Sequence, residues 1–189
     1  MKRMTTMLAL FLSCILLLVG CSKSLGGTQS STKTITYQGK EYTVPNNPER
    51  TAVLANSVAY MLYELGVIPS ARTLSTDKLP EALEKVPVIG QTTNVNIEAL
   101  ISNKPNFVIG LSPTGDKYKD ALTNNKIPHM IITYDGINDN VPLLETLGKI
   151  YNKEDKASAA IKAYQKKKKK IKDSIKKEKP KRVAVLFAS

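Results

Sequence analysis

The chain has 189 residues and a formal net charge of +12, and it contains two cysteines and one histidine. This length allows one domain with a substantial core, whereas two complete domains would be tight. Both cysteines, Cys14 and Cys21, lie at the start of the chain, so the composition excludes a zinc finger, a disulfide scaffold and a cysteine nucleophile in the rest of it.

The excess of positive charge lies in one segment. Between residues 21 and 150, twelve basic side chains balance twelve acidic ones, whereas residues 151–182 carry fourteen basic and four acidic side chains. A nucleic-acid surface would interleave its basic residues with aromatic ones, and the lysine-rich segment lacks that pattern. We therefore expect no nucleic-acid partner.

The start of the chain has the pattern of a bacterial lipoprotein signal. A basic pair at Lys2 and Arg3 precedes a short apolar run over residues 8–18, and Leu18-Val19-Gly20-Cys21 is a lipobox. We predict a signal peptide over residues 1–20 and lipidation, of the palmitate type, at Cys21. The protein would then be held at the extracellular face of the cell membrane, as in Gram-positive bacteria. An ordinary secretory signal or a single transmembrane helix is the alternative.

Strand and helix patterns alternate along residues 34–150, after a Ser-, Thr- and Gly-rich segment over 21–33 that predicts a flexible tether. This alternation predicts the α/β class, as a Rossmann-like lobe with a parallel sheet and an N-terminal hairpin. The expected elements are a hairpin over 34–44, a strand over 51–55, a helix capped by Asn56 or Ser57 that ends at Gly66, a strand from 67, a helix over 79–84, an extended passage over 86–90, a helix capped by Asn96, a strand over 105–110, a helix around 118–122 and a strand over 127–132.

The remaining chain is helical and rich in lysine. A helix is expected over residues 140–150, and a long helix over 153–177 carries a thin apolar stripe. The consecutive lysines Lys166 to Lys170 point all round that helix, which favours a solvated surface over contact with anionic lipid or teichoic polymers. Residues 183–188 again have the pattern of a buried strand. We assign a connecting helix to residues 151–179 and the start of a second, truncated lobe to residues 180–189.

The order of these motifs carries a family resemblance. Three passages define it: Pro48-Glu49-Arg50-Thr51-Ala52-Val53-Leu54, then Val88-Ile89-Gly90, then the helix-to-strand passage from Asn96 to Gly110. Together they resemble the iron-siderophore, haem and vitamin B12 binding lipoproteins of ABC importers. The last passage departs from the family pattern at Asn106 and Phe107, where the family has Asp and Leu.

The resemblance extends over Thr34 to Ser189 and implies a function. Proteins of this family have two α/β lobes joined by one long helix, which residues 153–177 look like, and they hold the ligand between the lobes. The resemblance implies a monomeric, membrane-anchored protein, without a cofactor, that captures a ferric siderophore and delivers it to an ABC permease and its ATPase. A structural surface lipoprotein without a transport role is the alternative from another class.

Candidate ligand-binding residues follow from the predicted sheet, because ligands of open α/β sheets bind beyond the carboxyl ends of the strands. Those ends carry polar, mostly uncharged side chains that can hydrogen-bond a chelate and provide no nucleophile-base pair and no direct metal ligand. Each also has an ordinary interpretation, because such residues favour turns and caps. The candidates are Asn56, Ser57, Arg72, Gln91, Thr92, Thr93, Ser112 and Tyr134.

Glu98 is a candidate of a different kind. It occupies the second helical position after the Asn96 cap, where a carboxylate complements the positive end of the helix. In the family that this chain resembles, the matching glutamate lies on the outer surface of the first lobe and pairs with arginines of the permease. The resemblance therefore implies a permease contact at Glu98.

The identity of the ligand depends on a few positions. Haem-binding members have a methionine just after Gly-Gln, and this chain has Thr92 there, while Met61 and Met130 have core spacing. Cobalamin recognition relies on aromatic stacking, and the chain has no tryptophan. A ferric siderophore remains the expected ligand, and haem or cobalamin is the alternative within the same family. Arg72 is the basic cleft candidate for an anionic siderophore, or else a surface residue of its loop. The single histidine, His129, is expected to be structural, and no catalytic motif is present, so an enzyme is not expected.

Overall fold

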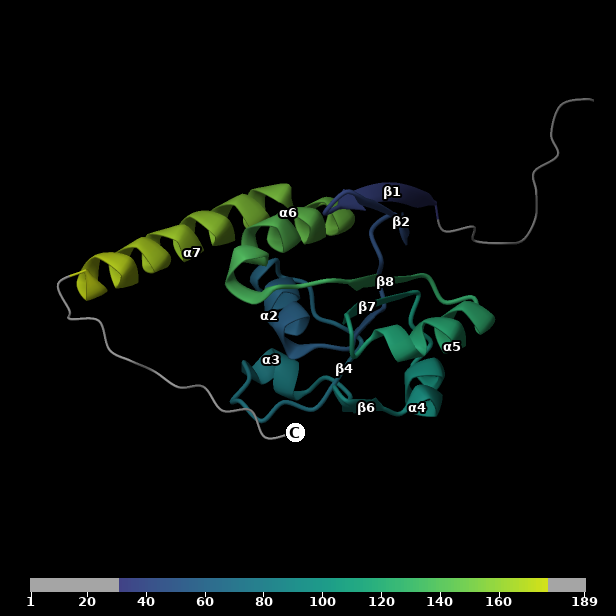
Figure 1. Cartoon of the computed structure of the whole chain (residues 1–189). Helices are drawn as coiled ribbons and strands as arrows, with labels where there is room; N and C mark the ends of the chain where they lie inside the picture. Colours follow the sequence, from purple (N-terminus) through teal and green to yellow (C-terminus); the bar gives the residue numbers. More distant parts are fainter. Residues whose placement is uncertain (1–30, 177–189) are drawn as a thin grey trace, which may run out of the picture. The chain divides into compact units, whose positions relative to one another are not determined.

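The structure is a computed structural model that describes residues 31–176 (Figure 1). The predicted signal peptide, the lipidation site at Cys21 and the strand predicted over residues 183–188 lie outside the described residues. Within residues 31–176, no helix combines the length and the apolar character needed to cross a membrane.

The described chain starts with the predicted hairpin. Strands β1 (Thr32–Tyr37) and β2 (Lys40–Pro45) pair antiparallel. Gln38 and Gly39 connect them with φ angles of 49° and 75°, as a two-residue turn of this twist requires, and glycine adopts such an angle without steric strain. The hairpin is confirmed, although β1 begins inside the segment predicted as tether.

The central sheet has four strands in the order β4-β3-β7-β8, and all neighbours are parallel. Its strands are β3 (Thr51–Val53), β4 (Ala71–Arg72), β7 (Phe107–Leu111) and β8 (His129–Ile132). Ala52 is the partner of both Ala71 and Val108, which fixes the register of three strands around β3. The Rossmann-like parallel sheet is therefore confirmed.

Helices cover both faces of the sheet, and the remaining elements connect them (Figure 1). The helices are α2 (Asn56–Glu64), α3 (Glu81–Glu84), α4 (Ile97–Ser102), α5 (Lys119–Asn124), α6 (Asn140–Tyr151) and α7 (Glu154–Ile175). Two short 3₁₀ turns, η1 (Asp116–Tyr118) and η2 (Gly136–Asn138), and the small antiparallel pair β5 (Gly90–Gln91) and β6 (Asn94–Val95) complete the chain.

Alternation along the strands divides the core into two layers, because successive side chains of a strand point to opposite faces. Val53 and Ile109 belong to the layer that packs against α2, α6 and the first half of α7. Ala52 and Val108 belong to the other layer, under α4 and α5. Burial on both faces explains why these strands are uniformly apolar in sequence.

Two helix boundaries show how local chemistry determines the fold. Asn96 caps α4 as predicted, because its Oδ1 accepts a hydrogen bond from the Ala99 amide at 2.9 Å. The predicted cap of α2 is wrong: Ala55 holds the N-cap position, and Asn56 is already helical. At the other end of α2, the Val67 amide donates to the Leu62 carbonyl at 2.8 Å, so Val67 closes the helix and does not begin a strand.

The buried residues Thr51 and Tyr151 connect α6 to the central strand β3. Their hydroxyl oxygens lie 2.5 Å apart, and each residue is 2% exposed. Burial raises the pKa of the Tyr151 phenol. This hydrogen bond holds α6 against the sheet. Because the αL residue Asn152 (φ 53°) follows α6 directly, the contact also positions the start of α7.

We expect Tyr151→Phe to lower the free energy of unfolding by about 1–3 kcal/mol, because it leaves the buried Thr51 hydroxyl without a partner. Urea unfolding followed by circular dichroism measures this change. The control is Tyr63→Phe, at a side chain 37% exposed, which should change the free energy of unfolding by less than about 0.5 kcal/mol. Equal stabilities of the two variants would contradict the assigned role of Tyr151.

Candidate functional site

The candidate site lies at the carboxyl edge of the sheet. Because β4, β3, β7 and β8 are all parallel, the segments that follow them emerge at one edge. These segments carry Thr73, Asn56, Ser112 and Tyr134 respectively. The fold thus brings together residues from four separate parts of the sequence.

One part of this edge is a hydrogen-bonded polar group around Asn56. The Asn56 Nδ2 atom donates to the Leu74 carbonyl at 2.8 Å, and the Thr92 hydroxyl donates to the Thr73 hydroxyl oxygen at 3.1 Å. The other amide atom, Asn56 Oδ1, is buried and has no hydrogen-bond partner among residues 31–176. Most buried acceptors in folded proteins are paired, so this oxygen is an exception among the buried polar atoms of the described chain.

The other part of the edge is a cavity of about 360 Å³ between α2, α6 and α7. We call it the edge pocket; its polar lining includes Ser57, Tyr60, Tyr134, Asn140 and Tyr164. Tyr134 donates to Asn140 Oδ1, and Asn140 Nδ2 donates to the Tyr164 hydroxyl at 3.3 Å. Aromatic faces with a few fixed polar groups are the usual lining of a small-molecule site.

Sequence reasoning placed Ser57 and Tyr134 at this edge and missed Tyr60, Asn140 and Tyr164. Tyr60 follows Ser57 by three residues on the same face of α2, so helical spacing contained a usable signal for it. No comparable signal exists for Tyr164, which reaches the pocket from α7, 30 residues beyond Tyr134.

The other predicted residues have different surroundings. Gln91 and Thr93 are exposed in the β5–β6 turn, next to the half-buried Thr92. Ser112 donates its hydroxyl hydrogen to the carboxylate of Asp116 and so faces away from the Asn56 group, toward the hairpin. Glu98 is exposed in the first turn of α4 and does not line the edge pocket.

Arg72 has a structural environment. It is 6% exposed, and its guanidinium donates to the carbonyls of Leu83 at 2.8 Å, Thr73 at 3.0 Å and Glu84 at 3.4 Å. These contacts hold α3 against β4 and use the donors that an anionic ligand would need. This geometry differs from the cleft position expected for Arg72, because the carbonyls of Leu83 and Glu84 in α3 bind the guanidinium inside the protein.

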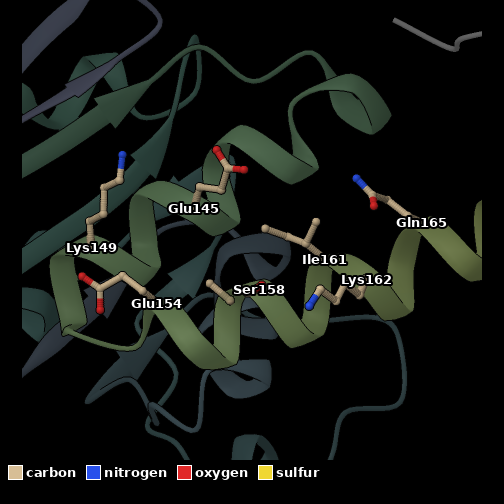
Figure 2. Close-up of a pocket in the computed structure, with 8 residues that line it drawn as sticks. Glu145, Lys149, Glu154, Ser158, Ile161, Lys162 and Gln165 are labelled. Atoms are coloured by element: carbon tan, nitrogen blue, oxygen red, sulfur yellow. The ribbon is translucent and has the colours of Figure 1, made fainter.

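Other notable features lie away from the strand ends. His129 begins β8 with its Nδ1 3.0 Å from the Ile127 carbonyl oxygen, and residues 31–176 contain no group of three or more His, Cys, Asp or Glu residues that could hold a metal ion. Figure 2 shows a groove of about 410 Å³ between α6 and α7, where Glu145, Lys149, Glu154 and Lys162 mix both charges. The groove contains none of the predicted ligand-binding residues.

The chain is similar to a protein family, to a curated protein and to solved structures. The family described as periplasmic binding protein matches residues 51–189. A curated protein of Bacillus subtilis (strain 168), described as the probable siderophore-binding lipoprotein YfiY, is 31% identical over 134 residues, which cover 65% of this chain and 41% of that protein.

Two solved structures are similar in fold. The siderophore-binding protein BauB, bound to a complex of two acinetobactin molecules and ferric iron, has a TM-score of 0.64 at 23% identity over 80% of this chain and 57% of that chain. Staphylococcus aureus SirA complexed with staphyloferrin B has a TM-score of 0.61 at 24% identity over 72% of this chain and 48% of that chain. The chain therefore spans about half the length of the relatives it matches.

Burial makes the phenols of two tyrosines near this edge weaker acids than an exposed tyrosine. It raises the pKa of Tyr37 to about 12, with a further contribution from the negative charge of Asp139. It also raises the pKa of Tyr134, with contributions from Tyr164 and Asp139. Both phenols therefore remain protonated hydrogen-bond donors at neutral and mildly alkaline pH.

Stability should consequently fall at alkaline pH. The unfolded chain releases a tyrosine proton near pH 10, whereas folded Tyr37 retains its proton up to about pH 12, so this stabilisation is present below about pH 10 and is lost as the pH rises toward 12. Urea unfolding at a series of pH values measures the effect. Tyr37→Phe should make the decline less steep, and an unchanged slope would contradict the burial of this phenol.

Proposed function

The chain belongs to the periplasmic binding protein family, and from this premise we propose that it forms the N-terminal ligand-binding lobe of a lipoprotein that captures a ferric siderophore for an ABC importer. The observation that carries the proposal is the edge pocket, where three tyrosines and a few polar side chains, with Glu64 and Lys167 among the lining, gather near the carboxyl edge of a parallel sheet. Such a surface stacks on a bulky chelate and hydrogen-bonds to it.

The named ligands of the relatives support this chemical class. One relative is described as siderophore-binding, and two similar structures hold a ferric siderophore complex and staphyloferrin B. Because the chain spans about half of each, we infer that the edge pocket supplies one side of the site and that a second lobe supplies the other. A binding role without catalysis agrees with this surface, where three phenols, one amide and one hydroxyl lie among apolar side chains, Glu64 and Lys167.

We assign ligand contact to Asn56, Ser57, Thr92 and Tyr134, and add Tyr60 from α2. Gln91 and Thr93 are rim residues of the same edge, and Ser112 belongs to its hairpin side. Arg72 stabilises the edge from within the core, because its guanidinium donates to three backbone carbonyls.

A haem complex is less favoured than a siderophore. Met130 is completely buried in β8, and Met61, which borders the edge pocket, is 9% exposed and packs in the core. An axial thioether ligand from Met130 would have to leave the core to reach iron. Membrane anchorage through Cys21, and delivery to a permease and its ATPase, complete the proposed function.

Tyr134→Ala tests the binding surface. We expect ferric chelates to quench tyrosine fluorescence saturably, since the chain has eight tyrosines and no tryptophan. Loss of one aromatic anchor should weaken binding about tenfold, equivalent to about 1.4 kcal/mol. The control is Tyr63→Ala, outside the edge pocket. Haem and cobalamin serve as competitors, and saturable binding of haem with no response to any ferric siderophore would refute the proposed ligand.

Glu98→Ala tests delivery separately from capture. Because Glu98 is exposed and outside the edge pocket, we expect chelate affinity to be unchanged. Uptake of radiolabelled ferric chelate by cells should fall by a few-fold, since an exposed ion pair is worth at most about 1 kcal/mol. Glu145→Ala, at an exposed position of α6 that borders the α6–α7 groove and lies outside the edge pocket (Figure 2), is the matched control. Weaker chelate binding by the Glu98 variant would place this residue in the site.

A further inference from the structure

A second cavity, distinct from the edge pocket, lies between the hairpin and the ends of β7 and β8. It has a volume of about 210 Å³, and we call it the hairpin pocket. Its lining includes Tyr37, Lys40 and Tyr42 from the hairpin and Ser112, Asp116 and Lys119 from the segment after β7. These two groups of residues are about 70 positions apart in the sequence and meet only in the fold.

Tyr37 is the unusual residue of this cavity. It is 3% exposed, and its hydroxyl is buried without a hydrogen-bond partner among residues 31–176. A buried hydroxyl without a partner destabilises a fold, and phenylalanine would fill the same space without that penalty. A tyrosine at this position is therefore explained by a group that enters the pocket and accepts its hydrogen bond.

The charges of the hairpin pocket favour an anion. Asp116 is already satisfied, because the Ser112 hydroxyl donates to it and the Lys119 Nζ atom lies 2.5 Å from its Oδ1; these contacts lower the pKa of Asp116. Lys40 lies over the Tyr42 ring, 5.8 Å from its centre, and forms no ion pair with any residue from 31 to 176. Among the residues that line the cavity, the two ammonium groups of Lys40 and Lys119 therefore outnumber the single carboxylate of Asp116.

We propose that the hairpin pocket binds the carboxylate of a small organic acid, with Tyr37 as the hydrogen-bond donor and Lys40 as the counter-charge. The volume accommodates a carboxylate with a few carbon atoms, because a water molecule occupies about 30 Å³ in the liquid, and it is too small for a whole chelate. The acid is either a free molecule or one arm of a ferric chelate. The chelate alternative rests on the proposed function, and the free-acid alternative does not.

The test uses the whole chain and citrate as the probe. Citrate titrations are followed by the amide NMR signals of residues 37–42 and 112–119. We expect saturable shifts, and a loss of affinity of at least tenfold in both Tyr37→Phe and Lys40→Gln. Matched controls are Tyr63→Phe and Lys78→Gln, at exposed positions outside the pocket, which should bind citrate as the unmodified chain does.

Thermal unfolding separates a binding role from a structural one. If Tyr37 serves a ligand, Tyr37→Phe should keep or raise the unfolding temperature while citrate affinity falls. A lowered unfolding temperature with unchanged citrate affinity would overturn the proposal, as would the absence of citrate shifts at the hairpin.

Two iron complexes distinguish the sources of the carboxylate. If the carboxylate belongs to a chelate, Tyr37→Phe should weaken ferric citrate and leave ferrioxamine B, a hydroxamate chelate without a carboxylate, unaffected. If citrate binds in a Tyr37-dependent way and no ferric siderophore binds, the acid is free, and the proposed siderophore function fails while the hairpin pocket stands. Equal weakening of both iron complexes would overturn the carboxylate assignment.

Discussion

The parallel pairing of four short strands, buried on both faces, is the constraint on which the rest of the structure depends. Strands of two to five residues are too short to be stable alone, so two apolar layers have to cover them. Because the strands run in the same direction, every connection returns over a face, and every polar segment that follows a strand emerges at one edge. The candidate site is therefore a geometric consequence of how the core is covered.

Buried polar contacts then position this edge. The Arg72 guanidinium binds three backbone carbonyls and holds α3 beside β4, while the Thr51–Tyr151 contact holds α6 beside β3. Both are enclosed by apolar side chains, where hydrogen bonds are stronger than at the surface. The elements on the two sides of Asn56 are thus held in place by contacts within the core.

The sequence was sufficient for the features that local chemistry controls. The Gln38-Gly39 turn, the Asn96 cap and the alternation of apolar strands with helices each follow from neighbouring residues. It was insufficient where the outcome depends on distant residues. The orientation of Arg72 is set by carbonyls about eleven residues away on a short helix, and the pocket role of Tyr164 depends on how α7 crosses α2. The sequence presents Tyr37 as an ordinary strand residue, because the residues that complete the hairpin pocket with it begin only at Ser112.

The two cavities differ in the chemistry they offer, and this difference bears on selectivity. The edge pocket presents phenols, one amide and one hydroxyl among apolar and charged side chains, whereas the hairpin pocket combines a buried phenol with an ammonium that forms no ion pair within residues 31–176. A site that hydrogen-bonds a ligand group rejects analogues lacking it far more strongly than an apolar surface rejects a change in shape. Under the two proposals made above, discrimination among chelates would therefore rest more on the few residues at the hairpin than on the larger edge pocket.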